Sequence, residues 1–372
     1  MGLAAARRIL EERFGHARFR VHQLKVLGPL LAGRNVLAVL PTGAGKSLCY
    51  QVPALLGTGL TLVISPLISL MQDQVGALRR RGIAAAYVNS QLGAAQRRIV
   101  LDAATSGRLA LLYCAPERLG SLTRRLATGG GGTRVTLLAI DEAHCITEWG
   151  SEFRPVYRRL GLFRSLLGRP LTIALTGSAT PAARADILHV LRMPDAEVVV
   201  TSFDRPNLIF ATRRVRDDRE RFASIRARVR DAPGASLIYT PTRRLTELIT
   251  RALLRTSVRA APYHAGLSAN TRRQVLRGFL GDRIHVIVAT SAFGMGIDKP
   301  DVRQVLHWGP PPTLEAYYQE AGRGGRDGKM SDCLVLWRPE DFAWGNISPA
   351  MRRYVESRAN HRELILEYFG ES

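Results

Sequence analysis

Short apolar runs alternate with longer amphipathic stretches along most of this sequence. From residue 36 onward the runs read VLAVL, TLVIS, LALLY, VTLLAI and LTIALT, and they are rich in leucine or β-branched residues. The buried strands of a parallel sheet are apolar along their whole length, because helices cover both faces of the sheet. The alternation therefore predicts an α/β fold with a doubly wound parallel sheet.

A second series of the same kind follows the segment SFDRPN, where Pro206 ends whatever precedes it. Its strands are expected at ASLIY, AAPYH, HVIVAT, VRQVLHWG and CLVLW. At 372 residues the chain is long enough for two domains. We therefore expect two tandem parallel-sheet domains and a short C-terminal helical tail, at residues 1–206, 207–341 and 342–372.

The charge of the chain indicates a polyanionic partner. The formal net charge is +22 and the isoelectric point is near 11.0, so nucleic acid is the first candidate, with a general bias toward arginine as the alternative. The four cysteines form no CxxC pair, which indicates neither a disulfide framework nor a zinc site. The sequence has no long apolar run and no signal-peptide core, so we expect a cytoplasmic protein without a membrane partner.

The stretch LPTGAGKSLCYQ, residues 40–51, follows a predicted strand and opens a predicted helix. Such a loop cradles phosphates, because its glycines let backbone N–H groups converge and a helix N-terminus favours an anion. Lys46 is expected to reach the outer phosphates of a nucleotide, and Ser47 is expected to hold Mg²⁺. The residues expected to line the nucleotide here are Thr42, Gly43, Ala44, Gly45, Lys46 and Ser47.

Two acids and two arginines complete the predicted ATP site. Asp141 and Glu142 follow the apolar run 135–140; Asp141 is expected to bind Mg²⁺ and Glu142 to orient or deprotonate the attacking water. Arg323 and Arg326 lie in QEAGRGGRDG in the second half of the chain. An arginine from a second domain can stabilise the charge that builds on a γ-phosphate. The alternatives are two solvated acids and a solvated basic turn.

An aromatic-rich loop comes directly after the two acids. CITEWGSEFRP places Trp149, Phe153 and Arg154 within six residues, and this set can stack on an exposed base. Only a few residues separate the loop from Asp141 and Glu142. One loop can therefore report to a nucleic-acid site whether ATP is present.

From these motifs the chain resembles the RecQ-family DNA helicases of superfamily 2, almost from end to end. The resemblance is carried by FGHARFRVHQ, PTGAGKS, DEAH with the aromatic-rich loop, LTGSA, SFDRPN, YHAGL, ATSAFGMGIDKPDVR and QEAGRGGRDG. It implies two tandem RecA-like domains that hydrolyse ATP with Mg²⁺ in the cleft between them. It also implies 3′ to 5′ movement along DNA and work in DNA repair or recombination.

The resemblance further implies roles for single residues. His16, Arg20 and Gln23 stand in the adenine-reading segment, with His16 where the family usually has tyrosine. Gly296 and Asp298 are expected near the nucleotide. The residues expected to contact DNA are Ser65, Gln72, Trp149, Phe153, Arg154, His264, Thr290 and Ser291.

Further positions depart from the family pattern. HRELILEYFGE resembles the helix that leads into a four-cysteine zinc module, but Asn360 stands where the first cysteine is expected. We therefore expect a helicase core without zinc and without the winged-helix domain. Ser151 replaces a histidine that relays DNA binding to the ATP site in the family.

The predicted partners are single-stranded and forked DNA, and the sequence does not determine a single-strand-binding or repair partner. Two interpretations of the activity stay open. The first is an ATP-dependent DNA helicase and translocase. The second is an ATP-switched DNA-binding or strand-annealing ATPase without processive unwinding. An RNA helicase is disfavoured by the aromatic-rich loop.

Overall fold

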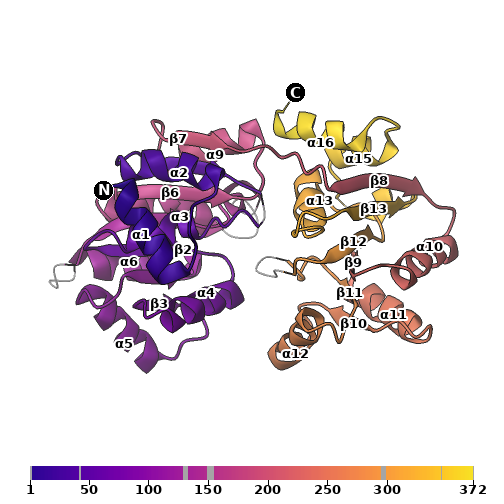
Figure 1. The fold of residues 1–372 in the computed structure, drawn as a ribbon, viewed down its shortest axis with the longest axis horizontal. Helices are drawn as coiled ribbons and strands as arrows, with labels where there is room; N and C mark the ends of the chain where they lie inside the picture. The colour runs from indigo at the N-terminus through magenta and orange to yellow at the C-terminus, as the bar shows by residue number, and fades with distance from the viewer. Residues whose placement is uncertain are drawn as a thin grey trace. The chain divides into compact units, whose positions relative to one another are not determined.

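The structure is a computed structural model, and it describes residues 2–41, 43–128, 133–148, 155–294, 299–344 and 346–371. The chain forms two compact units, Met1–Ser202 and Phe203–Ser372. Each unit is built around its own sheet (Figure 1). The division falls at the start of SFDRPN, and the sequence places the domain boundary near residue 206 in the same segment.

A parallel sheet forms the centre of the first unit. In the described residues its strands follow the order β3-β4-β2-β5-β6-β1-β7, and all neighbouring pairs are parallel. The strands are β1 (Val36–Val39), β2 (Leu60–Ile64), β3 (Ala85–Val88), β4 (Leu111–Cys114), β5 (Val135–Ile140), β6 (Leu171–Thr176) and β7 (Glu197–Val200). The apolar runs predict β1, β2, β4, β5 and β6. The two edge strands carry a weaker signal, since β3 begins with two alanines and β7 with a glutamate.

Helices connect the strands of the first unit, as parallel pairing requires. The α-helices are α1 (Leu3–Phe14), α2 (Val21–Leu31), α3 (Leu48–Ala54), α4 (Ile68–Arg80), α5 (Ala94–Thr105), α6 (Leu119–Thr128), α7 (Cys145–Glu148), α8 (Leu160–Leu166) and α9 (Pro181–Leu191). Two 3₁₀ turns, η1 (Pro116–Arg118) and η2 (Pro155–Arg159), lie among them.

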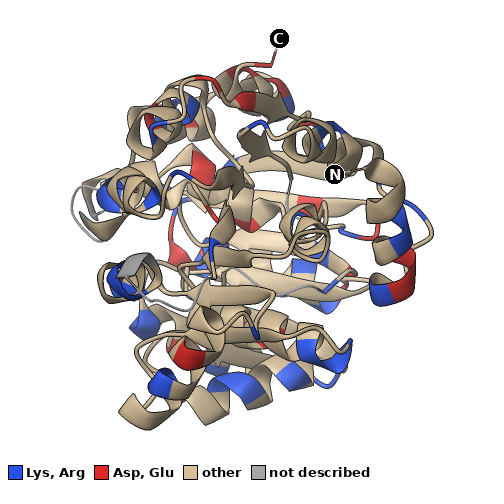
Figure 2. Cartoon of the chain, turned by 90° about the vertical axis from the view of Figure 1, so that its left-hand side faces the viewer, with Lys and Arg blue, Asp and Glu red and all other residues tan. Residues whose placement is uncertain are grey.

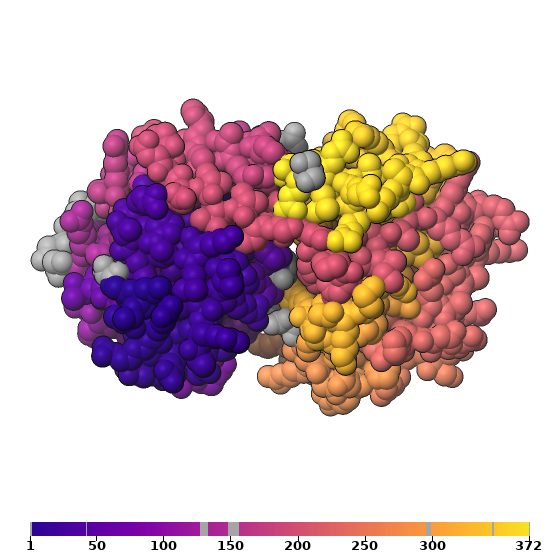
Figure 3. Space-filling model, turned by 45° about the horizontal axis from the view of Figure 1, so that its top comes forward, coloured from indigo at the N-terminus to yellow at the C-terminus, as the bar shows by residue number. Residues whose placement is uncertain are grey.

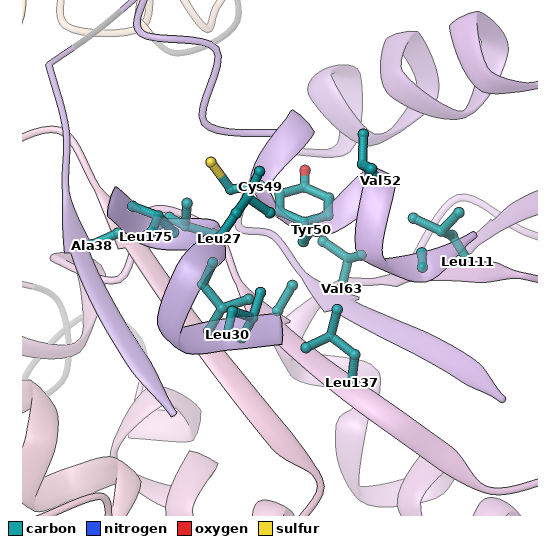
Figure 4. Packing of buried hydrophobic residues seen from close by; sticks show 14 of the residues in the cluster. Leu27, Leu30, Ala38, Cys49, Tyr50, Val52, Val63, Leu111, Leu137 and Leu175 are labelled. Carbon is teal, nitrogen blue, oxygen red and sulfur yellow. The ribbon is translucent and has the colours of Figure 1, made fainter. Parts of the chain in front are cut away.

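Both faces of this sheet are buried. Successive side chains of a strand point to opposite faces, and alternate residues such as Val63 and Leu137 pack in one core with helices α1 to α4. Figure 4 shows Leu27 and Leu30 of α2 and Tyr50 of α3 gathered over these strand residues. Intervening residues of the same strands, such as Leu62 and Leu138, are also buried. Burial on both faces explains why the strands read as continuous apolar runs.

A second parallel sheet forms the centre of the second unit, with the strand order β10-β11-β9-β12-β13-β8 in the described residues. The strands are β8 (Leu208–Arg214), β9 (Ala235–Tyr239), β10 (Ala260–Tyr263), β11 (Val286–Ala289), β12 (Val302–His307) and β13 (Ser331–Trp337). The helices are α10 (Asp218–Arg230), α11 (Arg243–Leu254), α12 (Ala269–Leu280), α13 (Leu314–Ala321), α14 (Asp341–Trp344), α15 (Pro349–Glu356) and α16 (His361–Phe369). The fold class expected from the sequence is confirmed. Within the described ranges, no helix combines the length and apolarity needed to cross a membrane.

The C-terminal helix α16 holds the start of the second unit in place. The ring of Phe203 stacks on that of Phe369, with 4.3 Å between centroids and 9° between planes. The backbone N–H of Phe203 donates to Glu371 Oε1 at 2.8 Å, and Arg362 Nε donates to Asp204 Oδ1 at 2.6 Å. In Figure 3 the C-terminal helices, coloured yellow, lie over the beginning of this unit. The helical tail is therefore part of the second unit and fixes the segment that enters it.

A buried cation joins α10 to the end of the second sheet. Arg221 is 1% exposed, and its Nη1 donates to the carbonyl oxygen of Trp308 at 2.7 Å. Its Nη2 donates to Asp341 Oδ2 at 2.7 Å. The guanidinium also lies over the Trp308 ring, 5.4 Å from the centroid. A buried charge is tolerated only when it is paired and hydrogen-bonded in this way.

We expect Arg221→Ala to lower the stability of the second unit by about 3 kcal/mol, because it leaves the Asp341 carboxylate without its buried partner. The measurement is urea unfolding of the full chain, followed by tryptophan fluorescence, since Trp308 contacts the mutated side chain. The matched control is Arg230→Ala, which removes an exposed pair with Asp231 and should leave the unfolding midpoint unchanged. Equal midpoints for the two variants would contradict the assignment.

Candidate functional site

The predicted phosphate loop joins β1 to α3 at the carboxyl end of the first sheet. Gly43 and Gly45 have φ angles of 83° and 74°, in the left-handed region that favours glycine. Lys46 Nζ donates to the carbonyl oxygen of Leu40 at 3.3 Å, so the ammonium group lies over the loop. Thr42 lies outside the described residues.

The first turn of α2 holds this loop through three side chains. Arg20 Nη1 donates to the carbonyl of Gly43 at 2.8 Å, and Gln23 Nε2 donates to the carbonyls of Ala44 and Gly45 at 3.2 and 3.1 Å. His22 Nε2 lies 2.8 Å from the carbonyl oxygen of Ala44, so this nitrogen carries the proton. The sequence does not predict the role of His22, because a single histidine in VHQ has no signal of its own.

Both the oxygen and the nitrogen of the Gln23 side-chain amide form hydrogen bonds. Its Oε1 accepts the backbone N–H of Arg20 at 2.9 Å, while its amide nitrogen binds the loop. A Cβ atom built on Gly45 would lie 2.6 Å from Gln23 Nε2, so the close approach requires glycine. His16, the third residue of the predicted adenine-reading segment, is exposed.

The acid pair Asp141 and Glu142 follows β5, two strands away from β1 in the sheet. The backbone N–H of Asp141 donates to the carbonyl of Ile64 at 2.8 Å, and its carboxyl group is buried. Burial, and next the negative charge of Glu142, raise the pKa of Asp141 to about 7, whereas Lys46 acts to lower it. A buried carboxylate beside a second carboxylate is stabilised by a cation. These residues therefore fit a site for Mg²⁺ and phosphate.

Strand β6 lies between β1 and β5 and connects the two motifs. The backbone N–H of Leu40 donates to the carbonyl of Thr176 at 3.0 Å, so the phosphate loop begins beside the end of β6. On the other side, His144 Nδ1 lies 3.0 Å from Thr176 Oγ1 and 3.4 Å from Glu142 Oε2. Glu142 has a φ of 52°, which is uncommon for a residue with a side chain. DEAH, the phosphate loop and LTGSA thus meet at one edge of the sheet.

A buried polar chain runs from α3 to α4 behind this edge. Gln51 Nε2 donates to Gln74 Oε1 at 2.7 Å and to the Tyr113 hydroxyl at 3.1 Å. The Tyr113 hydroxyl donates to that of Tyr50 at 3.5 Å, and the Tyr50 side chain lies beside that of Ser47. Burial raises the pKa of Tyr113 to about 12, so these hydroxyls keep their protons. The sequence does not predict the chain, because its members come from three separate elements.

Two residues predicted to contact DNA lie in the described part of the first unit. Ser65 is fully buried just after β2, and its hydroxyl has no hydrogen-bond partner among the described residues. Its contact with a DNA phosphate stays a prediction. Gln72 on α4, by contrast, is exposed, and its Nε2 donates to Gln91 Oε1 at 3.3 Å. The residues of the aromatic-rich loop that lie outside the described ranges are Trp149, Phe153 and Arg154.

The predicted arginines of the second unit follow α13. Arg323 is 7% exposed, and within the described part of the chain its Nε and Nη1 atoms have no hydrogen-bond partner. Its guanidinium lies beside the hydroxyl of Tyr239 at the end of β9 and interacts with it. Arg326 is half-buried, and its charge also acts on Tyr239. An unsatisfied buried guanidinium is costly, and an anion would satisfy it.

The other predicted residues of the second unit lie at the ends of β10 and β11. Thr290 is half-buried and Ser291 is exposed, just after β11. His264 is buried, and its Nε2 lies 2.9 Å from Glu247 Oε1, so a direct contact with DNA stays a prediction. Gly296 and Asp298 lie outside the described residues.

Cysteine and metal chemistry give no further site in the part of the chain that the structure describes. All four cysteines are buried and free, and burial raises the pKa of Cys49 to about 12. No group of three or more His, Cys, Asp or Glu side chains in the described ranges could hold a metal ion. Figure 2 shows Lys and Arg on many helices and loops, in keeping with the net charge of +22.

Solved structures resemble this fold closely. The Mycobacterium smegmatis helicase Lhr, bound to single-stranded DNA and AMP-PNP, gives a TM-score of 0.71 at 22% identity, over 95% of this chain and 50% of that one. The Saccharomyces cerevisiae protein Dbp5, bound to RNA and ADP BeF3, gives a TM-score of 0.73 at 16% identity, over 100% of this chain and 93% of that one. At these identities the likeness shows the tandem RecA-like fold alone.

The sequence matches known families and proteins along both units. Residues 20–187 match the DEAD/DEAH box helicase family, and residues 221–328 match the helicase conserved C-terminal domain. The ATP-dependent DNA helicase RecQ of Bacillus subtilis is 42% identical over 97% of this chain, and that of Pasteurella multocida is 40% identical over 98%. This chain spans 60% of the length of each of those two proteins.

This chain covers a larger share of a shorter relative. The probable ATP-dependent DNA helicase RecS of Bacillus subtilis is 40% identical over 90% of this chain, which spans 67% of that protein. The matches run through both units and include the phosphate loop, the acid pair and the two arginines. The chain therefore belongs to the RecQ family of superfamily 2 helicases.

Proposed function

We propose that this protein is an ATP-dependent DNA helicase and translocase that moves 3′ to 5′. The observation that carries the proposal is the junction at Thr176, which places Lys46, Asp141 and Glu142 at one edge of the first sheet. The relatives named above are described as ATP-dependent DNA helicases. DNA repair or recombination in the nucleoid is the setting that the family resemblance favours.

The residues divide the chemistry of ATP hydrolysis between them. Lys46 binds the outer phosphates, and the Ser47 hydroxyl and Asp141 carboxylate hold Mg²⁺, which neutralises charge on the phosphate oxygens. Glu142 orients the attacking water and accepts its proton. Arg323 and Arg326 of the second unit approach the γ-phosphate and stabilise its developing charge. The nucleotide is held between the two RecA-like domains in this proposal.

Adenine recognition and loop geometry are linked through Gln23. An amide is well suited to pair with the N6 and N7 atoms of adenine. Both ends of the Gln23 amide group already hold the phosphate loop and Arg20. We propose that adenine competes for these bonds, so the loop senses the base as well as the phosphates. His16 stacks on the base from its exposed position.

In this proposal both units bind DNA. Trp149, Phe153 and Arg154 stack on an exposed base, and Gln72, Thr290 and Ser291 bind the phosphate backbone. Stacking on one base is worth about 1 to 3 kcal/mol, and a DNA stacking step averages about 1.4 kcal/mol. Capture of one frayed base by Trp149 is therefore sufficient to bias a fork toward opening.

We expect Glu142→Gln to lower kcat for ATP by about 10² to 10⁴-fold, because the water loses its base. The affinity for an ATP analogue should stay within a few-fold. Lys46→Ala should lose both turnover and tight binding. The measurements are steady-state ATPase and fluorescent-nucleotide binding, with Lys25→Ala as the control at an exposed lysine. Normal turnover by Glu142→Gln would exclude it as the base.

Trp149→Ala should keep nucleotide binding but lose most of the stimulation of ATPase by single-stranded DNA, because the base no longer stacks. Stimulation by DNA and by RNA of equal length is compared across salt concentrations, since phosphate contacts weaken with salt. The expected result is a clear preference for DNA in the unmutated protein. Stimulation of the variant equal to that of the unmutated protein would remove Trp149 from the coupling.

Strand displacement tests the helicase activity itself. The second function is an ATP-switched strand-annealing ATPase, which the replacement of the family histidine by Ser151 favours. We expect the full chain to open a short forked duplex with a 3′ tail only when ATP and Mg²⁺ are present. Annealing of complementary strands with no displacement, alongside DNA-stimulated ATPase, would favour the second function.

A further inference from the structure

Tyr239 stands at the carboxyl end of β9, in the interior of the second sheet. Its side chain is buried, and its ring stacks on that of His307 with 5.2 Å between centroids and 17° between planes. Its hydroxyl donates to the carbonyl oxygen of Phe293 at 2.8 Å. The donated proton fixes the orientation of the hydroxyl and leaves the oxygen lone pairs free to accept.

The guanidinium of Arg323 lies beside the Tyr239 hydroxyl and interacts with it. Its Nη2 atom also lies next to the turn, 3.8 Å from where a Cβ atom on Gly294 would be. Arg323 is 7% exposed, and among the described residues its Nε and Nη1 atoms are unpartnered. Three residues earlier, Glu320 binds His307 Nε2 at 2.9 Å, so the same imidazole supports both the ring of Tyr239 and α13. Tyr239 is therefore the polar side chain that connects this buried arginine to the turn.

The other end of the tyrosine contact lies on a tight turn after β11. The backbone N–H of Phe293 donates to the carbonyl of Thr290 at 3.0 Å, and that of Ala292 lies 3.4 Å from Thr290 Oγ1. This turn carries Thr290 and Ser291, the residues proposed to bind DNA phosphates. One hydroxyl thus joins the turn to Arg323.

We infer that Tyr239 is a positioning residue that holds the guanidinium of Arg323 in register with the turn at residues 290–293. The inference rests on the proposed function, in which Arg323 stabilises the γ-phosphate. A guanidinium with two unpartnered N–H groups needs a fixed anchor to point them at a phosphate. The Tyr239 hydroxyl also binds the turn. A movement of the turn when DNA binds is therefore transmitted to Arg323 through this hydroxyl.

The test is Tyr239→Phe in the full chain, which removes the hydroxyl and keeps the ring on His307. The variant should lower kcat of the DNA-stimulated ATPase by about tenfold to 150-fold, the usual worth of a polar contact to a charged group. The KM for ATP should change less than twofold. The matched control is Tyr317→Phe, whose buried hydroxyl donates to the Cys333 carbonyl at 3.4 Å and whose ring also packs on His307.

A double-mutant cycle separates positioning from a general loss of structure. In an Arg323→Ala background, Tyr239→Phe should cause no further loss of kcat, because the group that it positions is gone. An equal loss in both backgrounds would overturn the inference, as would wild-type kcat for Tyr239→Phe. A loss of the same size in Tyr317→Phe would also overturn it. Full kcat for Arg323→Ala alone would instead contradict the proposed role of Arg323 in ATP hydrolysis, whatever the effect of Tyr239→Phe.

Discussion

The end of β6 is the constraint on which the first unit depends. Its last residue, Thr176, accepts a backbone hydrogen bond from Leu40 on one side and contacts His144 on the other. In a parallel sheet every strand presents its carboxyl end at the same edge, so loops that are distant in sequence meet there. Thr176 converts this general property into a fixed spacing between the phosphate loop and DEAH.

The buried polar side chains behind this edge form hydrogen bonds with one another. Gln51, Gln74, Tyr113 and Tyr50 form a buried chain of hydrogen bonds that ends beside Ser47. Buried polar networks are rigid when they are complete, because each broken bond leaves an unsatisfied group in a low-dielectric interior. The network therefore gives the loop a stiff support on the side away from the nucleotide. It also joins α3 to α4, which carries the exposed Gln72.

Hydrophobic periodicity and motif spacing predict part of the fold and part of the candidate site. Apolar runs predict the interior strands, and the motifs that hold Lys46, Asp141 and Arg323 predict ATP hydrolysis as the chemistry. Of the four edge strands, AAPYH predicts β10, whereas β3, β7 and β8 are missed; β8 reads LIFATRR and is only partly buried. Contacts between distant elements also escape: His22 and Tyr239 match no motif, and the burial of Ser65 depends on packing around β2. A tyrosine that ends a buried strand is nevertheless a usable signal, because that edge is where ligand sites form.

Two arginine side chains are buried in the second unit, although burial of a charged group is unfavourable in itself. Arg221 is 1% exposed, and its two Nη atoms bind Trp308 and Asp341, while its Nε has no partner among the described residues. Arg323 is 7% exposed, and both its Nε and its Nη1 have no partner there. A missing partner for a buried polar group costs about 1 to 3 kcal/mol. The larger deficit at Arg323 is one that an anion can recover, which is the expected signature of a binding group.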